Sequence, residues 1–202
     1  MNIKMFKRLL ISSLFAISSF ANAGLITLNS GDYYGALGGV GESRGISFEA
    51  LSTFSISSVG IEAALNAQDF EIVIWSSTNG HQLNNLLASS AQTFGTTSLG
   101  WNDIAIDFTF TIGNFYAFEW RPVSVNKTWA STLTYYNDSS LPASIDGKFK
   151  LIDGYEAEFG FSNFLHPNLR VNTVTRDVPE PSTLAIFALG IIGLTSRKLK
   201  KQ

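Results

Sequence analysis

The side chains able to support catalysis are few, and their spacing matches no familiar catalytic pattern. His81 follows Asn79-Gly80, and His166 precedes Pro167. Neither histidine belongs to a spaced metal-binding pattern such as H-x-x-x-H, and we interpret both as surface loop residues. Serines are numerous, but no Gly-x-Ser-x-Gly elbow singles out a nucleophile. We therefore expect a protein without enzymatic activity.

The acidic residues give two further hypotheses. Asp146 and Asp153 each precede a glycine, and Glu156 follows closely. Because Ca²⁺ takes several oxygen ligands, a structural calcium is one interpretation and solvated turn carboxylates are the other. The EF-hand spacing is missing, so we predict no cofactor. Glycoside hydrolysis would need two carboxylates about 5 to 10 Å apart. The strand residues Asp103, Asp107 and Glu119 are candidates that nothing in the sequence pairs.

Aromatic side chains form the third set of candidates. The apolar faces of sugar rings stack well on exposed aromatic planes. Trp75 and Trp120 lie in apolar runs and are expected in the core. Trp129 and Tyr135 lie in a Ser/Thr-rich segment, and we predict them as glycan-stacking residues. The full set of aromatic candidates is Trp75, Trp101, Trp120, Trp129, Tyr135 and Tyr136.

The elements that must position these residues are β-strands. Apolar residues alternate with polar ones along 104–110, and Tyr116, Phe118 and Trp120 share one face of the next strand. The run 70–75 is apolar on both faces and predicts a central strand. Further strands are predicted at 46–50, 53–65 (broken near Gly60), 87–94, 128–136, 148–152 and 169–175. This number of short strands predicts an all-β, jelly-roll-like β-sandwich.

Turn residues separate the predicted strands. Turns are expected at 79–80, 98–100, 112–114 and 153–154. The segment 82–90 is interpreted as a turn that leads into a strand. The order of strands and turns from Phe54 to Trp120 resembles the jelly-roll ectodomains of bacterial surface proteins. That resemblance implies a fold and no chemistry.

Charge and cysteine content limit the function of the body of the chain. Residues 24–177 hold 7 Lys and Arg against 15 Asp and Glu, a net charge of about -8. Nucleic-acid binding needs clustered basic residues, so an acidic body excludes it as the expected function. The chain has no cysteine. Disulfides, thiolate catalysis and thiolate metal sites are therefore excluded.

The first 23 residues have the three parts of a secretory signal peptide. Lys4, Lys7 and Arg8 supply the positive region, and 9–20 is a stretch of apolar residues and serines. Ala21 and Ala23 form a small-x-small cleavage site. We expect a signal helix that reaches the secretion translocon and is removed by signal peptidase after Ala23.

The last 25 residues contain a second targeting pattern. Val178, Pro179, Glu180 and Pro181 come first, and the two prolines hold this entry extended. The segment 182–196 contains 15 uncharged residues, fewer than the roughly 20 of a stable membrane span. The predicted single hydrophobic helix contains Leu184, Ile186, Phe187, Leu189, Ile191, Ile192 and Leu194. The basic residues that would keep the tail cytoplasmic are Arg197, Lys198, Lys200 and Lys201.

This C-terminal pattern resembles the PEP-CTERM sorting signal of Gram-negative bacteria. The resemblance covers Val178 to Lys201, with one departure: the basic tail includes Leu199 and ends in Gln202 instead of being a pure arginine run. It implies processing by an exosortase, a membrane protease that cuts near the Pro-Glu-Pro motif. It also implies a transient inner-membrane tether, followed by release to the cell surface or extracellular matrix in association with exopolysaccharide.

Together these features predict three regions: a signal peptide at 1–23, a β-sandwich ectodomain at 24–177 and a sorting signal at 178–202. The expected function is that of an exported surface or matrix protein, associated with exopolysaccharide in a biofilm and able to bind carbohydrate. Two alternatives stay open. One is a small secreted polysaccharide-active enzyme, and the other is a structural matrix subunit without a ligand.

Overall fold

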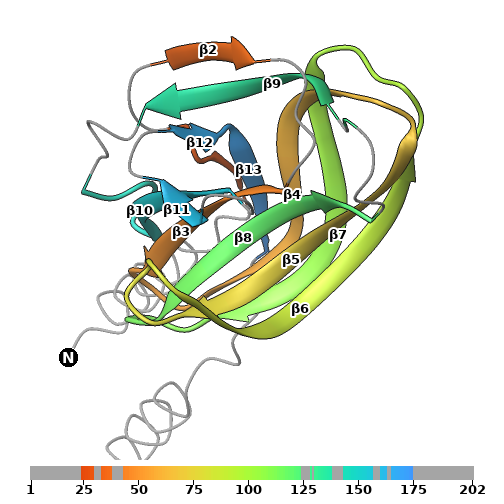
Figure 1. Cartoon of the computed structure of the whole chain (residues 1–202). Helices are drawn as coiled ribbons and strands as arrows, with labels where there is room; N and C mark the ends of the chain where they lie inside the picture. Colours follow the sequence, from red (N-terminus) through yellow and green to blue (C-terminus); the bar gives the residue numbers. More distant parts are fainter. Residues whose placement is uncertain are drawn as a thin grey trace, which may run out of the picture. The chain divides into compact units, whose positions relative to one another are not determined.

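The computed structural model describes residues 24–29, 33–37, 43–123, 128, 130–137, 143–156, 160–162 and 165–174. Every regular element in these ranges is a β-strand (Figure 1). The signal peptide, Trp129 and the sorting segment lie outside the described residues. The strands are β1 (Leu25–Thr27), β2 (Tyr33–Leu37), β3 (Arg44–Ala50), β4 (Phe54–Leu65), β5 (Gln68–Ser77), β6 (Leu83–Phe94), β7 (Gly100–Phe110), β8 (Phe115–Pro122), β9 (Ala130–Asn137), β10 (Phe149–Glu156), β11 (Gly160–Ser162), β12 (Leu165–Pro167) and β13 (Leu169–Val174).

The strands form two antiparallel sheets. The seven-stranded sheet has the order β1-β13-β4-β9-β12, with β7 also paired to β4 and β2 to β9. The six-stranded sheet has the order β11-β10-β3-β8-β5-β6. Residues 55–61 of β4 pair with both β13 and β7, so β4 lies between them. The sets β1-β13-β4-β7 and β3-β8-β5-β6 reproduce jelly-roll connectivity, which confirms the predicted fold.

The core lies between the two sheets and is strongly aromatic. Alternate residues of each strand point inward, so Ile104 and Phe110 of β7 are buried, as are Phe118 and Trp120 of β8. Phe48 of β3 is at the centre of an aromatic cluster. Its ring lies 5.3 Å from that of Phe110, 5.0 Å from Phe118 and 5.0 Å from Phe149, measured between centroids. The alternation predicted along 104–110 and 116–120 is therefore confirmed.

The body of the chain forms one compact unit, Ala23–Val174, which contains all of the described core. The strands β9 to β12 lie between β8 and β13 in the sequence and lengthen both sheets. β9 pairs with the end of β4 at Ala63–Leu65, and β10 pairs with β3. Because this unit has its own core and both of its sheets, we expect residues 23–177 to fold without the two terminal segments.

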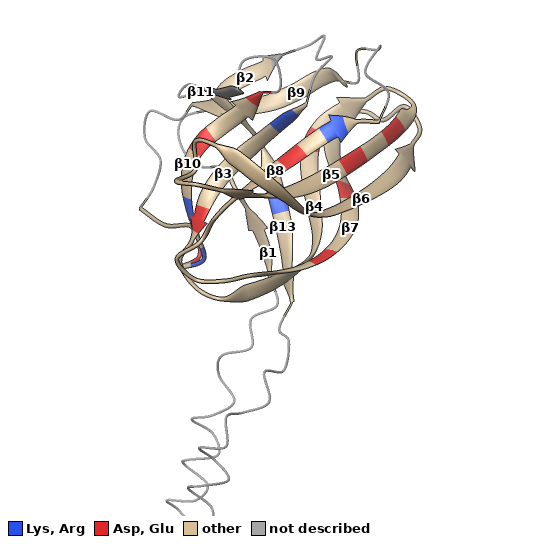
Figure 2. Ribbon diagram, turned by 60° about the horizontal axis from the view of Figure 1, so that its bottom comes forward, with Lys and Arg blue, Asp and Glu red and all other residues tan. Residues whose placement is uncertain are grey.

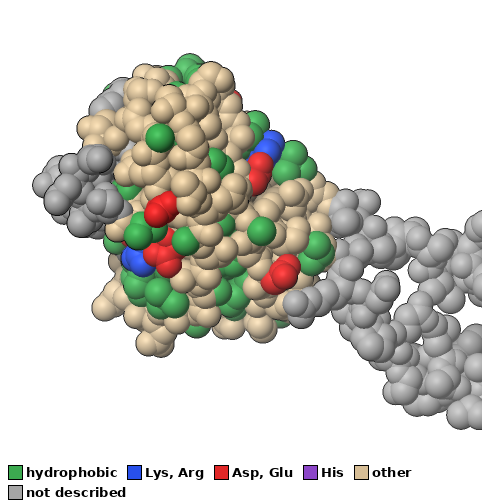
Figure 3. Space-filling model, turned by 90° about the vertical axis from the view of Figure 1, so that its right-hand side faces the viewer, with side chains coloured by type: hydrophobic (Ala, Val, Ile, Leu, Met, Phe, Trp, Pro, Cys, Tyr) green, Lys and Arg blue, Asp and Glu red, His purple; other side chains and the backbone are tan. Residues whose placement is uncertain are grey.

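Charged residues are unevenly placed on this unit. They recur on β10, β3, β8 and β5 of the six-stranded sheet (Figure 2). The side of the molecule seen from the right of Figure 1 shows mainly backbone and uncharged polar side chains, with hydrophobic side chains and a few charged ones scattered among them (Figure 3).

Several local predictions are corrected by the structure. Asp153-Gly154 is no turn, because both residues lie inside β10 and pair with β3. The strand β4 passes through Gly60 without a break, and its irregularity opposite β7 falls between Ile56 and Ser58. The strand β6 begins at Leu83, so most of the segment interpreted as a turn is strand. In each case strand pairing outweighs a local turn preference.

Candidate functional site

The outer face of the six-stranded sheet carries a connected group of polar and aromatic side chains. Tyr116, Phe118 and Trp120 point into the core. The residues between them on β8, which include Glu119 and Arg121, therefore point to the opposite face. On β5 the same alternation turns Glu71, Val73 and Trp75 outward, because Ile72 and Ile74 are buried in the core.

The strand register aligns these outward residues across the sheet. Cα pairing places Tyr155, Gly45, Glu119 and Val73 in one row across β10, β3, β8 and β5. The adjacent row contains Asp153, Ser47, Ala117 and Trp75. The two middle strands thus contribute small residues, Gly45, Ser47 and Ala117. Large side chains from the flanking strands have room to lie across them.

Trp75 is anchored across the sheet by a hydrogen bond. Its indole Nε1 donates to Glu119 Oε2 at 2.7 Å. Arg121 lies beside the same carboxylate, with Nη1 3.7 Å from Glu119 Oε2. Arg121 also donates through Nη2 and Nε to Glu71 Oε2, at 2.7 and 2.9 Å. The half-buried indole is therefore held at one edge by a network of two carboxylates and one guanidinium.

The charges of this network set the protonation of its members. Partial burial alone would raise the pKa of Glu71, but hydrogen bonds from Ser89 and Arg121 and the positive charge of Arg121 lower it overall. Burial raises the pKa of Tyr155, as does the negative charge of Glu119, against the opposing effect of Arg121. Glu71 is therefore an ionised acceptor, and Tyr155 keeps a neutral phenol.

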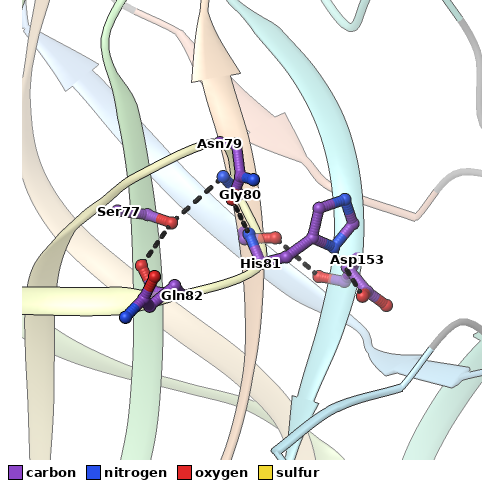
Figure 4. Close-up of polar contacts among 7 residues, drawn as sticks. Ser77, Asn79, Gly80, His81, Gln82 and Asp153 are labelled. Atoms are coloured by element: carbon purple, nitrogen blue, oxygen red, sulfur yellow. Dashed lines mark hydrogen bonds and ion pairs between the residues drawn. The ribbon is translucent and has the colours of Figure 1, made fainter.

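The turn between β5 and β6 is docked against β10 on this sheet (Figure 4). Asn79 and Gly80 both have positive φ, 112° and 84°, which suits an Asn-Gly turn. Gly80 is buried, and a Cβ there would meet the side chain of Ile152 on β10. Ser77 Oγ accepts from the Gly80 amide at 3.1 Å and donates to the Gln82 carbonyl at 2.8 Å. These contacts fix the path of the turn.

His81 of this turn pairs with Asp153 of β10. The distance from His81 Nδ1 to Asp153 Oδ2 is 3.1 Å, and the imidazole points toward the carboxylate (Figure 4). Asp153 is 1% exposed. Burial raises the pKa of Asp153, and its hydrogen bond with His81 and the charge of His81 oppose that rise only in part. The imidazole itself is half-exposed, so the pair joins a buried carboxylate to the surface.

The outer face of the seven-stranded sheet is a network of mutually paired side chains. Arg170 donates from Nε to Asp103 Oδ1 at 2.9 Å and also contacts Asp103 through Nη2. Its guanidinium lies 4.6 Å from the centroid of the Trp101 ring. Asn168 Nδ2 donates to Glu62 Oε2 at 2.8 Å. The Arg170–Asp103 pair spans β4 at Gly60 and joins β13 to β7, and Asn168 reaches Glu62 of β4, so these contacts are placed to stabilise the sheet.

Two residues that the sequence places at the surface prove to be buried. Tyr135 is 5% exposed, and its hydroxyl accepts from Arg44 Nε at 2.8 Å. It has no open ring face for a sugar, so the predicted stacking role of Tyr135 is wrong. His166 is buried in β12 and stacks on Tyr136 with centroids 6.1 Å apart, so it is no surface loop residue. Trp129, the other predicted stacking residue, lies outside the described residues.

The predicted acidic sites are not assembled in the described ranges. There, no three His, Asp or Glu side chains come together to hold a metal ion. Asp146 pairs with Lys148 Nζ at 2.5 Å, and Asp153 pairs with His81. Asp103 and Asp107 lie on β7, whereas Glu119 lies on β8 of the other sheet. Asp103 and Asp107 are themselves four residues, about 13 Å, apart along one strand. No pair of the three therefore has the spacing that glycoside hydrolysis requires.

A family comparison identifies the end of the chain. Residues 177–201 match the family model described as the PEP-CTERM protein-sorting motif. The chain carries a PEP-CTERM motif. It is therefore an exported protein that an exosortase, itself a membrane protein, sorts toward the cell surface. In the part of this PEP-CTERM protein that the structure describes, no helix is long and apolar enough to cross a membrane. The predicted segment at 184–194 lies outside that part.

Comparisons of the whole PEP-CTERM protein give distant likenesses. No curated protein matches it. A Podospora anserina GH26-CBM35 β-(1,4)-mannanase is 9% identical with a TM-score of 0.36, over 78% of this chain and 29% of the mannanase. A family 35 carbohydrate-binding module from an environmental isolate is 13% identical with a TM-score of 0.29, over 71% of this chain and 94% of the module. The chain thus spans about 29% of the mannanase's length.

Sequence reasoning missed most of the outer face. Glu71, Arg121 and Tyr155 were not singled out, and Trp75 was expected in the core. The alternation of side chains along β8 is a signal that reveals part of this face. If Phe118 and Trp120 point into the core, Glu119 and Arg121 must point to the opposite face. The pairing that brings β10 and β5 to opposite sides of β3 and β8 is long-range and has no local signature.

Proposed function

We propose that this exported protein binds a neutral polysaccharide through the outer face of its six-stranded sheet and does not cleave it. The observation that supports the proposal is the anchored indole of Trp75, held at 2.7 Å by Glu119 beside Arg121. An aromatic plane supplies the apolar contact for a sugar ring, and neighbouring charged groups supply hydrogen bonds to its hydroxyls.

The charges of the face favour an uncharged glycan. Glu71 and Glu119 both lie against Arg121, so the single guanidinium is offset by two carboxylates. A uronic acid or sulfated sugar placed there would meet net negative charge. The acidic body adds to that repulsion at long range. Neutral sugar hydroxyls can donate to the partly exposed Glu71 carboxylate without an electrostatic penalty, whereas Glu119 is 5% exposed and serves to hold the indole.

The same network favours binding over hydrolysis. A glycosidase of the usual kind needs one carboxyl group with a raised pKa, so that it can protonate the leaving oxygen. The pKa of Glu71 is lowered, chiefly through its contacts with Ser89 and Arg121. Glu119 already accepts a hydrogen bond from Trp75 and lies beside the same guanidinium. Both groups are suited to accept hydrogen bonds and poorly suited to act as the acid.

Export and exosortase sorting determine where this binding would take place. A sandwich delivered to the surface and released near the Pro-Glu-Pro motif would meet the extracellular polysaccharide of its own cell. We therefore place the protein in the extracellular matrix or biofilm, attached to exopolysaccharide through the six-stranded face. The exosortase would then contact the protein only during processing, and the polysaccharide would stay bound afterwards.

A pair of matched tryptophan variants tests the proposal. Residues 23–177 are applied to an array of neutral and acidic glycans, and affinity for the best ligand is measured by calorimetry. We expect Trp75→Ala to weaken binding about tenfold or more, because the stacking plane is lost. Trp101→Ala, on the seven-stranded sheet, should leave affinity unchanged.

Four outcomes would contradict the proposal. Equal affinity of wild type and Trp75→Ala would remove the stacking role of Trp75. A preference for acidic glycans would remove the charge argument. Turnover of any polysaccharide would favour the enzyme alternative. Absence of glycan binding together with self-association would favour a structural subunit.

A further inference from the structure

The outermost strand of the six-stranded sheet, β6, has an open hydrogen-bonding edge. Among the described strands β6 pairs only with β5. A strand with one partner leaves half of its backbone N–H and C=O groups free of the ladder, and another strand can pair with them. Proteins usually shorten, charge or distort such edges to prevent this pairing.

The other edge strands of the described sheets have these protections. β1, β11 and β12 have 3 residues each, and β12 contains Pro167. β2 has 5 residues and an irregular register at Gly35. β7 is long, but it carries Asp103 and Asp107. β6 is therefore the exception, with 12 residues and no charged side chain.

The composition and geometry of β6 favour pairing. No Asp, Glu, Lys or Arg occurs from Ile72 to Asn102, and β6 lies within that stretch. Its register with β5 is irregular near Trp75 but continuous from Ala88 to Phe94. Leu86 is 49% and Leu87 41% exposed, so apolar surface lies next to the open edge. Figure 3 shows this side of the molecule as mainly uncharged.

We propose that β6 pairs with β6 of a second copy of this chain, antiparallel, so that two six-stranded sheets become one continuous sheet. A second copy fits because identical uncharged strands meet without like-charge repulsion. A two-fold arrangement uses the same edge on both molecules and closes as a dimer. This interface is independent of the proposed glycan binding, because it uses the edge of the sheet and not its face.

The dimer has a defined geometry. The two-fold axis that relates antiparallel neighbours in one sheet is perpendicular to that sheet. The outer faces of both copies therefore lie on the same side of the joined sheet. The leucines of β6 lie in its first half, so in the antiparallel pair Leu86 and Leu87 of each copy would pack near the second half of the partner's strand and add apolar contacts to the backbone hydrogen bonds.

The test uses residues 23–177 over a range of concentrations. It measures the mass of the particles in solution and the rate at which backbone amides exchange their hydrogens. Sedimentation velocity should show a dimer that dissociates on dilution, and the amides of β6 should exchange more slowly in the dimer. The variant Ala91→Lys with Gln92→Lys places two charges on exposed positions of β6. We expect its dissociation constant to rise about tenfold or more, because charges are brought close to their copies across the edge.

The control variant adds the same two positive charges at positions outside β6. Ile112→Lys with Val123→Lys replaces two exposed apolar residues outside β6 and should dimerise like the wild type. Circular dichroism checks that both variants are folded. A monomeric wild type at all concentrations would overturn the proposal. Equal dimerisation of the β6 variant, equal loss in the control, or growth of long polymers would overturn it too.

Discussion

Replacing Gly45 with alanine should open the contact between β3 and β8 beneath the outer face. Gly45 sits opposite Glu119 in the β3–β8 register. A Cβ at this position would fall well inside the 3.0 Å limit of real Cβ contacts, against the backbone carbonyl oxygen of Phe118. Backbone cannot swing aside as a side chain can, so β8 would have to move by about 1 Å.

The size of that displacement determines the expected loss in the free energy of unfolding. β3 and β8 share six paired positions, and a shift centred on Gly45 would strain the two or three ladder hydrogen bonds around it. At about 1 to 1.5 kcal/mol net for each bond, the free energy of unfolding should fall by about 2 to 4.5 kcal/mol. For a domain of this size the melting temperature should then fall by about 5 to 15 °C.

Thermal and urea denaturation, followed by circular dichroism, measure this loss. Gly100→Ala is the matched control, because the nearest atom to a Cβ there is the Ser98 carbonyl oxygen at 3.9 Å. It should be neutral or slightly stabilising, since alanine reduces the entropy of the unfolded chain. Should Gly45→Ala melt within about 2 °C of the wild type, the packing argument for β3 and β8 is refuted.

Other predictions concern the core, the buried carboxylate and processing. Phe48→Ala should lower the free energy of unfolding by about 3 to 5 kcal/mol in urea titrations, because it empties the centre of the aromatic cluster; a loss below about 1 kcal/mol would contradict this. The raised pKa of Asp153 means that its stabilising contribution is complete below 3.8 and is lost as pH rises through the raised value. Asp153→Asn should therefore gain stability relative to wild type between acidic and neutral pH, and parallel melting curves at all pH values would argue against it. Mass spectrometry of the mature protein should find Gly24 at the start and a C-terminus near Pro179, whereas a surface form that keeps Gln202 would exclude exosortase processing.

The alternation of apolar and polar residues predicted the core but did not reveal the candidate site. Phe118 and Ile104 were assigned correctly, because polar neighbours fix which face is buried. The run Ile72-Val73-Ile74-Trp75 is apolar on both faces, so the sequence alone does not show that Trp75 turns outward. Asp153 was assigned to a turn because an Asp-Gly pair is a strong local turn signal, and only its pairing with β3 overrules that signal.

Long-range pairing explains the remaining differences. The burial of Tyr135 follows from the contact of its hydroxyl with Arg44, 91 residues away. The burial of His166 follows from the pairing of β12 with β9. Neither Arg44 as the partner of Tyr135 nor β9 as the partner of β12 can be recognised from residue spacing or composition. The sorting motif, by contrast, is read as a linear peptide, and for that reason its residues could be recognised from the sequence.

Gly24 and Thr173 are joined at the edge of the seven-stranded sheet. The Gly24 amide donates to Thr173 Oγ1 at 3.0 Å, and the Thr173 amide donates to the Gly24 carbonyl at 2.9 Å. The chain thus enters and leaves the sandwich at a single point, formed by β1 and β13. Because these residues at the two ends of the described body are bonded to each other, a short linker could join them and the chain could instead be opened at an exposed turn, which is the geometry that circular permutation requires.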